Sequence, residues 1–380
     1  MKTLSERSRT VQDEIADVHA VLRRRFPPIE RVAAAVYDPE SDLLKTFAHS
    51  TEGRSPLVLY EAPLSQTPSL ENLARSGRDR VIDDLHSLSD SPHEHTHRLI
   101  EKGYRSSYTM PLFEGGRLIG FLFFDSREPG YFKPLILEQL TIFARLLTLK
   151  LVQSFAESRL LGSALRIATR LTHYRDPETH GHLSRMAHCA RLIARDLASA
   201  RGLPDEWVES VFRYAPMHDI GKIAVPDRIL LKQGPLDEAE LEVMRSHVLK
   251  GVEIIDGILS ELNMSAIGQL DVLRNVVLGH HEAFDGTGYP HGRSGPEIPI
   301  EARIVMVADV FDALTSKRPY KAAWTVNDAL HYLSERAGAQ FDPDCVASLH
   351  ARRSEASLLV ARFKDGIGEV QSREGYSAEL

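Results

Sequence analysis

The sequence predicts an α+β first half, in which an antiparallel sheet is flanked by helices, joined by a long helix to an all-α second half. Short apolar runs separated by turn residues fill the first half. Apolar residues then recur three and four apart over residues 149–171. Further on, Asp205 caps a predicted helix from 206 to about 217, and Asp237 caps a predicted helix whose apolar stripe runs from Leu241 to Ile255. Because 380 residues can form two cores, we expect a first domain at residues 1–148, a connecting helix at 149–172 and a second domain at 173–380.

Composition narrows the class of protein. The chain is 43% hydrophobic and 26% charged, as in ordinary soluble proteins. A net charge of −7 argues against a nucleic-acid polymer as partner. No apolar run approaches the ~20 residues of a membrane span, and the charged N-terminus lacks a signal-peptide core. Two cysteines, Cys189 and Cys345, give no disulfide framework, so we expect a cytoplasmic protein.

The elements of the first half follow from apolar runs and turns. Gly115-Gly116 lies between two such runs and predicts a hairpin. The predicted elements are a helix at residues 5–25, strands at 31–37, 43–49, 107–112 and 118–125, and a helix from about 134 to 151.

Three histidines alternate at His93, His95 and His97. In an extended segment they would point to one side and could chelate an ion. A solvated loop is the simpler explanation, because loops are usually mobile and exposed. We predict the loop and assign no site there.

The connecting helix has one apolar face, made of Leu149, Val152, Ala156, Leu160, Ala164, Ile167 and Leu171. This face could form a parallel dimer seam that carries signals between the domains, or it could pack on its own domain. The small residues Ala156 and Ala164 weaken the seam. We expect a homodimer, and the sequence leaves the second alternative open.

The second half carries metal-ligand residue types at helix spacing. His218 stands beside Asp219, which pairs a nitrogen with an oxygen ligand, and the second carboxylate oxygen can reach another ion. Lys222 follows one turn later and can stabilise a phosphate or a leaving alkoxide. Glu178 and His182 are four apart, so on a helix they share a face.

Further candidates follow along the chain. His247 lies beside an apolar stripe and is either a core residue or a ligand. His280 and His281 can both reach an ion only if their helix ends there, and the turn residues 285–290 indicate that it does. Asp309 falls inside an apolar helix at 300–316, where a carboxylate needs a partner such as a metal.

These residues form one candidate ligand set: Glu178, His182, His218, Asp219, His247, His280, His281 and Asp309. The set exceeds what one ion can use, so two or three ions that share carboxylates fit better. Histidine and carboxylate without thiolate favour iron, with manganese or zinc as alternatives. His173, His180 and His188 are interpreted as structural or exposed.

The first half resembles a GAF domain over residues 15–150, in its first strand, its "PL…G…IGFLFFDS" hairpin and its final helix. The resemblance implies a regulatory domain that holds a small ligand or mediates dimers. It does not name the ligand.

The second half resembles the HD-GYP subgroup of HD-domain metal-dependent phosphohydrolases over about residues 165–352. The resemblance rests on His218-Asp219 with Lys222, His280-His281-Glu282, the run 285–290, the run 308–315, Arg318-Pro319-Tyr320-Lys321 and Phe341-Asp342-Pro343. It implies a helical bundle that hydrolyses cyclic di-GMP.

The resemblance also implies roles for single residues. His182, His218, Asp219, His247, His280, His281 and Asp309 look like metal ligands, with Asp219 as the bridge, and Glu178 looks like the ligand to a third ion. The chain departs from many relatives at His180, where they have glycine. Lys222 looks like the phosphate-facing lysine, and Arg318 and Lys321 look like contacts to the substrate. Gly288-Tyr289-Pro290 looks like a loop that contacts partner proteins, such as a diguanylate cyclase.

The expected function is a phosphodiesterase that opens cyclic di-GMP to pGpG and, with three ions, cuts it further to GMP. Paired ions activate water and neutralise phosphoryl charge, and the catalytic residues would be Asp219 and Lys222. Two alternatives stay open: a non-catalytic receptor for cyclic di-GMP or a partner protein, and a hydrolase of another cyclic dinucleotide such as cyclic GMP-AMP.

Overall fold

The computed structural model describes residues 10–39, 41–53, 55–89, 93–173, 175, 180–264, 269–316 and 322–363. Three predicted site residues, Glu178, Arg318 and Lys321, lie outside the described residues. The chain divides into two compact units, one made mainly of residues up to Leu160 and one mainly of residues from Leu161 onward.

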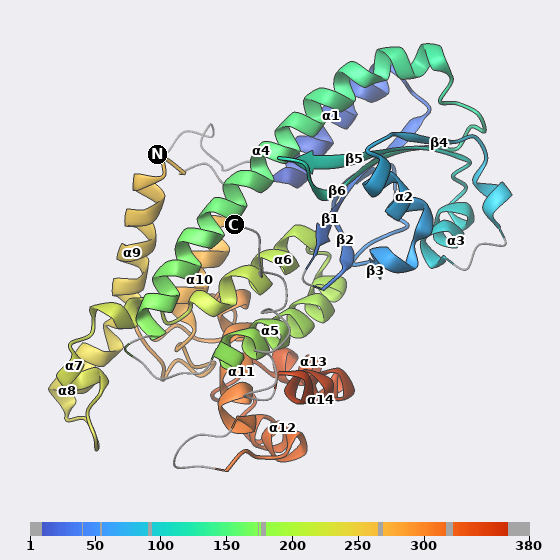
Figure 1. Cartoon of the computed structure of the whole chain (residues 1–380). Helices are drawn as coiled ribbons and strands as arrows, with labels where there is room; N and C mark the ends of the chain where they lie inside the picture. Colours follow the sequence, from blue (N-terminus) through green and yellow to red (C-terminus); the bar gives the residue numbers. More distant parts are fainter. Residues whose placement is uncertain are drawn as a thin grey trace, which may run out of the picture. The chain divides into compact units, whose positions relative to one another are not determined.

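The first unit is built on an antiparallel six-stranded sheet with the order β3-β2-β1-β6-β5-β4 (Figure 1). The four strands predicted from the sequence lie within its four longest strands. The strands are β1 (Ile29–Asp38), β2 (Leu43–Thr51), β3 (Glu61–Pro63), β4 (Arg80–Ile82), β5 (Ser106–Glu114) and β6 (Arg117–Ser126). The β5–β6 hairpin turns at Gly115 and Gly116, both with positive φ, which glycine adopts without strain.

Each face of the sheet is covered by different helices. On one face lie α1 (Val11–Arg25) and the first part of α4 (Pro134–His173), which bury Ile15, Leu22, Leu140 and Leu147 against the strands. A capping box between Thr10 and Asp13 begins α1. On the other face, α2 (Pro68–Ser76) buries two leucines, and α3 (Glu94–Glu101) follows.

The loop predicted at His93, His95 and His97 was wrong. Residues from Glu94 onward begin α3, and His93 occupies the N-cap position. The turn of helix buries Thr96, and the His95 ring lies edge-on to the Tyr60 ring with centroids 6.0 Å apart. A short polar helix with one buried side is easily read as a loop, because its polar residues dominate the composition.

The two helices predicted at 134–151 and 149–171 form one uninterrupted helix, α4, of 40 residues. Leu149, Leu160, Ile167 and Leu171 of the predicted face are each more than half exposed, as are Leu135, Ile142 and Leu146 before them. Leu151, Leu161 and Leu165, between them, are buried. One apolar side of α4 is therefore buried, and a second apolar side is exposed to solvent along the helix.

The second unit is helical. Its helices are α5 (His180–Arg201), α6 (Asp205–Tyr214), α7 (Asp227–Leu230), α8 (Glu238–Arg245), α9 (His247–Glu261), α10 (Leu270–Gly279), α11 (Ile300–Thr315), α12 (Val326–Glu335), α13 (Pro343–Ala351) and α14 (Arg353–Arg362). The core lies around α11, which is buried along nearly its whole length and packs on α5 and α10. Together the two units confirm the predicted fold class.

Two boundaries differ from the sequence prediction. The helix expected over 206–217 ends at Tyr214 and continues as a 3₁₀ turn over Ala215–Met217, because Pro216 has no N–H to donate to an α-helix. Asp237 caps α8 as predicted, with Glu240 completing a capping box, but the expected helix breaks at Ser246 and His247 opens α9. Among the described residues, none of the helices has the length and apolar character that a bilayer crossing requires.

Candidate metal centre

Short turns and helix ends position the candidate ligands. His218 and Asp219 lie between the 3₁₀ turn ending at Met217 and a second 3₁₀ turn over Ile220–Ala224. His247 begins α9, and His280 and His281 directly follow α10. His182 comes from the start of α5 and Asp309 from the middle of α11. The structure thus brings together seven of the eight predicted ligands, and their role as ligands remains a prediction.

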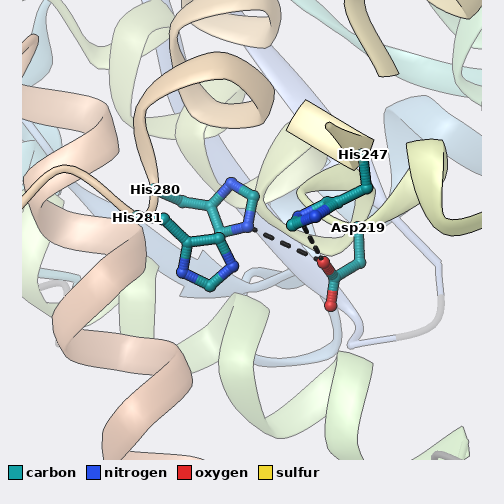
Figure 2. Close-up of side chains that lie close together, drawn as sticks. All are labelled: Asp219, His247, His280 and His281. Atoms are coloured by element: carbon teal, nitrogen blue, oxygen red, sulfur yellow. Dashed lines mark ion pairs between the residues drawn. The ribbon is translucent and has the colours of Figure 1, made fainter. Parts of the chain in front are cut away.

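The first group consists of Asp219, His247, His280 and His281, each offering one donor atom within 4.8 Å of the others (Figure 2). Asp219 Oδ1 lies 3.2 Å from His247 Nε2 and 3.7 Å from His280 Nε2. Three imidazole nitrogens and one carboxylate oxygen form a donor set that suits a borderline divalent ion.

The second group consists of His182, His218 and Asp309. Asp309 Oδ1 lies 3.8 Å from His182 Nε2 and 4.0 Å from His218 Nε2. His218 Nε2 is also 3.1 Å from Asp219 Oδ2, the second oxygen of the carboxylate in the first group. The two oxygens of Asp219 therefore face two neighbouring groups, which is the arrangement of a bridging carboxylate.

Hydrogen bonds orient four of the five imidazoles. The Nδ1 atoms of His218, His247 and His280 lie 2.8–3.1 Å from backbone carbonyl oxygens, which can only accept, so these Nδ1 atoms carry the proton. His182 Nδ1 lies 2.7 Å from the Asp312 carboxylate. The opposite nitrogen, Nε2, is then the lone-pair donor, and in each case it faces the centre of the group.

The buried atoms at the centre fit a cation. In the described part of the chain, Asp219 Oδ1, His247 Nε2 and His280 Nε2 are buried and make no hydrogen bond. Burial lowers the pKa of His280, so this imidazole stays neutral. Burial alone would raise the pKa of Asp219, but His218, Lys222 and His247 hold it well below its usual value. A buried carboxylate oxygen and imidazole nitrogens that face one another without hydrogen bonds fit a cation between them.

A close crossing of two backbones fixes Asp219 relative to His247. A Cβ added to Gly221 would lie 1.9 Å from the carbonyl oxygen of His247 and 2.5 Å from the backbone nitrogen of Gly251. A Cβ on Gly251 would lie 2.5 Å from the side chain of Val277. The two glycines therefore let the 3₁₀ turn after Asp219 pack directly on α9, next to α10.

Lys222 lies within the site rather than beyond it. Its Nζ is 2.9 Å from Asp219 Oδ2, and its side chain is 17% exposed. The ammonium thus helps to keep Asp219 ionised and remains partly open to solvent.

Sequence reasoning gave no role within the centre to three residues that support it. Asp312 accepts from both His182 and Arg185, and the burial that would raise its pKa is outweighed by these two partners, which lower it. Glu282 is buried and accepts from the backbone N–H groups of His291 and Arg293. The signal for Asp312 and Glu282 was present, because a carboxylate in a buried helix or beside two histidines needs a partner. Tyr289, the third, stacks on the His281 ring.

Two family models match this chain. Residues 174–345 match the HD domain and residues 8–151 match the GAF domain. These matches confirm the predicted combination of a GAF-like first half with an HD-type second half.

Several named relatives resemble the second half of the chain. The cyclic di-GMP phosphodiesterase response regulator RpfG of Xanthomonas campestris pv. campestris is 47% identical over 194 residues, which are 51% of this chain and 48% of that protein. A cyclic di-GMP phosphodiesterase of Thermotoga maritima is 40% identical over 205 residues, 54% of this chain and 53% of that protein. The 3'3'-cGAMP-specific phosphodiesterase 2 of Vibrio cholerae is 40% identical over 192 residues, 50% of this chain and 34% of that protein. The chain spans about half the length of the first two and a third of the third.

Proposed function

We propose that the second unit is a metal-dependent phosphodiesterase that hydrolyses cyclic di-GMP. The observation that carries this proposal is the pair of neighbouring donor groups joined by the two oxygens of Asp219. The names of the relatives from Xanthomonas campestris and Thermotoga maritima support the substrate.

One ion would be held by Asp219, His247, His280 and His281, and a second by His182, His218, Asp309 and the other oxygen of Asp219. A third would need Glu178. Iron is the metal we favour, with manganese or zinc as alternatives, because the donors are imidazole and carboxylate. When bound, paired ions supply an activated water and neutralise charge on the phosphoryl oxygens.

The remaining chemistry belongs to the chain's own residues. Asp219 stays ionised and orients both donor groups. Lys222, partly open to solvent and 2.9 Å from that carboxylate, would stabilise a phosphate oxygen or the leaving oxygen. Arg318 and Lys321 would bind the phosphates or guanines of the substrate.

The test is an anaerobic incubation of the purified chain with cyclic di-GMP and Fe(II) or Mn(II), with products separated and bound metal counted. GMP with about three ions per chain supports a trinuclear enzyme, and pGpG alone with about two ions supports a dinuclear one. Cleavage of 3'3'-cGAMP in preference to cyclic di-GMP would favour the alternative that the Vibrio cholerae relative suggests. No turnover by the fully loaded chain would overturn the enzyme and leave a receptor.

We propose that the first unit regulates this activity by binding a small anionic ligand. The unit contains a cavity of about 310 Å³, whose lining includes Ala34, Leu70, Phe123, His95 and Arg80. The guanidinium of Arg80 donates to the hydroxyls of Ser69 and Thr109 but has no carboxylate within 4 Å among the described residues. Burial lowers the pKa of Arg80, so an anionic group that offsets this cost would bind favourably there.

Three further properties complete the proposal. The exposed apolar side of α4 favours a homodimer, formed by pairing this helix with that of a second copy. A diguanylate cyclase is a candidate partner of Gly288-Tyr289-Pro290. Cys189 and Cys345 are buried and unbridged, which favours a reducing compartment such as the cytoplasm.

A further inference from the structure

His281 differs from the other four imidazoles of the metal centre in how its ring is held. His182, His218, His247 and His280 each place Nδ1 against an oxygen at 2.7–3.1 Å. Within the described residues, neither ring nitrogen of His281 makes a hydrogen bond. The last torsion of a histidine side chain has a broad energy profile, so something other than a hydrogen bond must fix this ring.

Aromatic contacts take the place of the hydrogen bond. The Tyr289 ring stacks on His281, with centroids 4.7 Å apart and planes 28° apart. His280 and His247 approach the same ring with centroids at 4.1 and 5.2 Å, but both belong to the donor group themselves. Among the described residues, Tyr289 is therefore the aromatic residue outside the donor group that stacks on His281.

Tyr289 is itself held firmly in the loop after α10. Its backbone N–H donates to the carbonyl oxygen of His281 at 3.1 Å. At Gly288, a Cβ would lie 2.1 Å from the backbone nitrogen of Ala283 and 2.4 Å from the His281 carbonyl oxygen, so the loop folds tightly against the residues that follow α10. The guanidinium of Arg245 lies 5.4 Å from the centre of the Tyr289 ring, within the range of a cation–π contact.

Glu282 fixes the other end of the loop. Its carboxylate, 2% exposed, accepts from the N–H of His291 at 2.8 Å and the N–H of Arg293 at 3.0 Å. Buried bonds of this kind to a charged group are among the stronger ones in proteins. The loop therefore leaves Tyr289 little freedom and carries this restraint to His281.

From this geometry we infer that Tyr289 is a positioning residue, whose ring fixes the His281 imidazole in the orientation that binds an ion. The inference rests on the proposed metal centre. It gives the 288–290 loop a role inside the chain, in addition to the contact with a partner protein that was predicted for it.

Metal binding by the full-length chain tests this inference. Tyr289→Ala removes the ring, Tyr289→Phe keeps the stack and loses only the hydroxyl, and His281→Ala removes the ligand. Binding of Mn(II) to the metal-free chain is followed by electron paramagnetic resonance of the free ion. We expect the alanine variant to bind one ion about tenfold more weakly, while the other ion and the phenylalanine variant stay within about twofold of the native chain.

A matched control is Tyr332→Ala, which removes a tyrosine in the same unit that contacts Trp324 and Arg336, away from the donor groups. It should leave metal binding unchanged. Thermal unfolding of each metal-free variant separates a folding defect from a binding defect. The visible spectrum of the Co(II)-loaded chain gives a second readout, because a lost or displaced imidazole changes the absorption of the ion.

Two results would overturn the inference: native Mn(II) binding by Tyr289→Ala, or an equal loss in Tyr289→Phe. A native chain that loads its ions but does not hydrolyse cyclic di-GMP would contradict only the proposed function. The comparison of the tyrosine variants would still decide the role of Tyr289.

Discussion

Two buried clusters of charge, one in each unit, are satisfied in different ways. In the first unit, the Arg31 guanidinium pairs with the Asp125 carboxylate, whose side chains are 3% and 1% exposed, and Ser107 donates to the same carboxylate. In the second unit, Asp219 Oδ1 and the Nε2 atoms of His247 and His280 are buried with no hydrogen bond in the described part of the chain. In the first arrangement the opposite charges pair within the chain, although Arg31 Nε makes no hydrogen bond in the described residues, whereas the second would be completed by a cation from outside.

The largest effect is expected where the missing charge would bind. Asp219→Ala removes the carboxylate shared by both donor groups, so hydrolysis of cyclic di-GMP should fall by about a thousandfold or more, which corresponds to the several kcal/mol that metal ions contribute. Product chromatography and metal counting on the same samples check it. Asp256→Ala, at an exposed pair with Arg274, is the control. Normal turnover by Asp219→Ala would contradict the proposal that both donor groups depend on this carboxylate.

The buried ion pair of Arg31 and Asp125 should affect folding instead. Asp125→Asn leaves Arg31 buried without its counter-charge, so the free energy of unfolding of the first unit should fall by about 3–5 kcal/mol. Urea unfolding measures it. The double variant Arg31→Met with Asp125→Leu should recover most of the loss, because two buried charges are then absent together. A double variant as unstable as the single one would refute this account.

A smaller effect is expected from the residue that orients His182. In Asp312→Asn the side chain can still bond His182 but loses its charge, and Arg185 loses its ion pair. We expect metal affinity at the group of His182, His218 and Asp309 to fall about 10–100-fold. Competition with a fluorescent chelator measures this affinity. Asp344→Asn, at an exposed pair, should change nothing.

In the cavity of the first unit the unmatched charge is positive, because Arg80 lines the cavity and has no carboxylate within 4 Å among the described residues. A panel of small aromatic carboxylates and nucleoside monophosphates should contain members that raise the melting temperature of the native chain. Arg80→Met should bind these about tenfold or more weakly, since a charge-assisted bond is lost. The control is Lys45→Met, which removes a buried ammonium that pairs with the half-buried Asp38 and does not line the cavity. An undiminished shift in Arg80→Met would exclude an anion at this residue.

The smallest effect concerns the partly exposed pair of Asp84 and Arg105. Hydrogen bonds from Arg105 and from the backbone of His86 lower the pKa of Asp84 to about 2. A lowered pKa stabilises the fold only while the carboxylate is ionised, so the contribution is present above about pH 4, the pKa range of a free aspartate, and is lost towards pH 2. The melting temperatures of the native chain and Asp84→Asn should therefore differ slightly at pH 6 and converge at low pH. A difference that grows in acid would contradict this sign.

Local patterns made much of this molecule predictable. Alternating apolar residues and Gly115-Gly116 define the strands and the hairpin, and the placement of histidines and aspartates at helix ends identifies residues that the fold gathers. The errors at Pro216 and Ser246 arose because an apolar stripe continues through a residue that breaks the helix. Contacts such as Asp312 with Arg185, or Tyr289 with His281, join side chains through tertiary packing and leave no periodic trace in the sequence.

The crossing at Gly221 and Gly251 has a consequence for how variants of this chain should be judged. Neither residue has a side chain that could bind a metal, yet a single methyl group at Gly221 would overlap the His247 carbonyl oxygen at 1.9 Å. A related sequence could therefore retain every histidine and aspartate of the centre and still hold Asp219 and His247 too far apart to share an ion. A check of the ligand residues alone would classify such a sequence as intact. The two glycines, Gly221 and Gly251, should therefore be required together with the ligands when related sequences are compared.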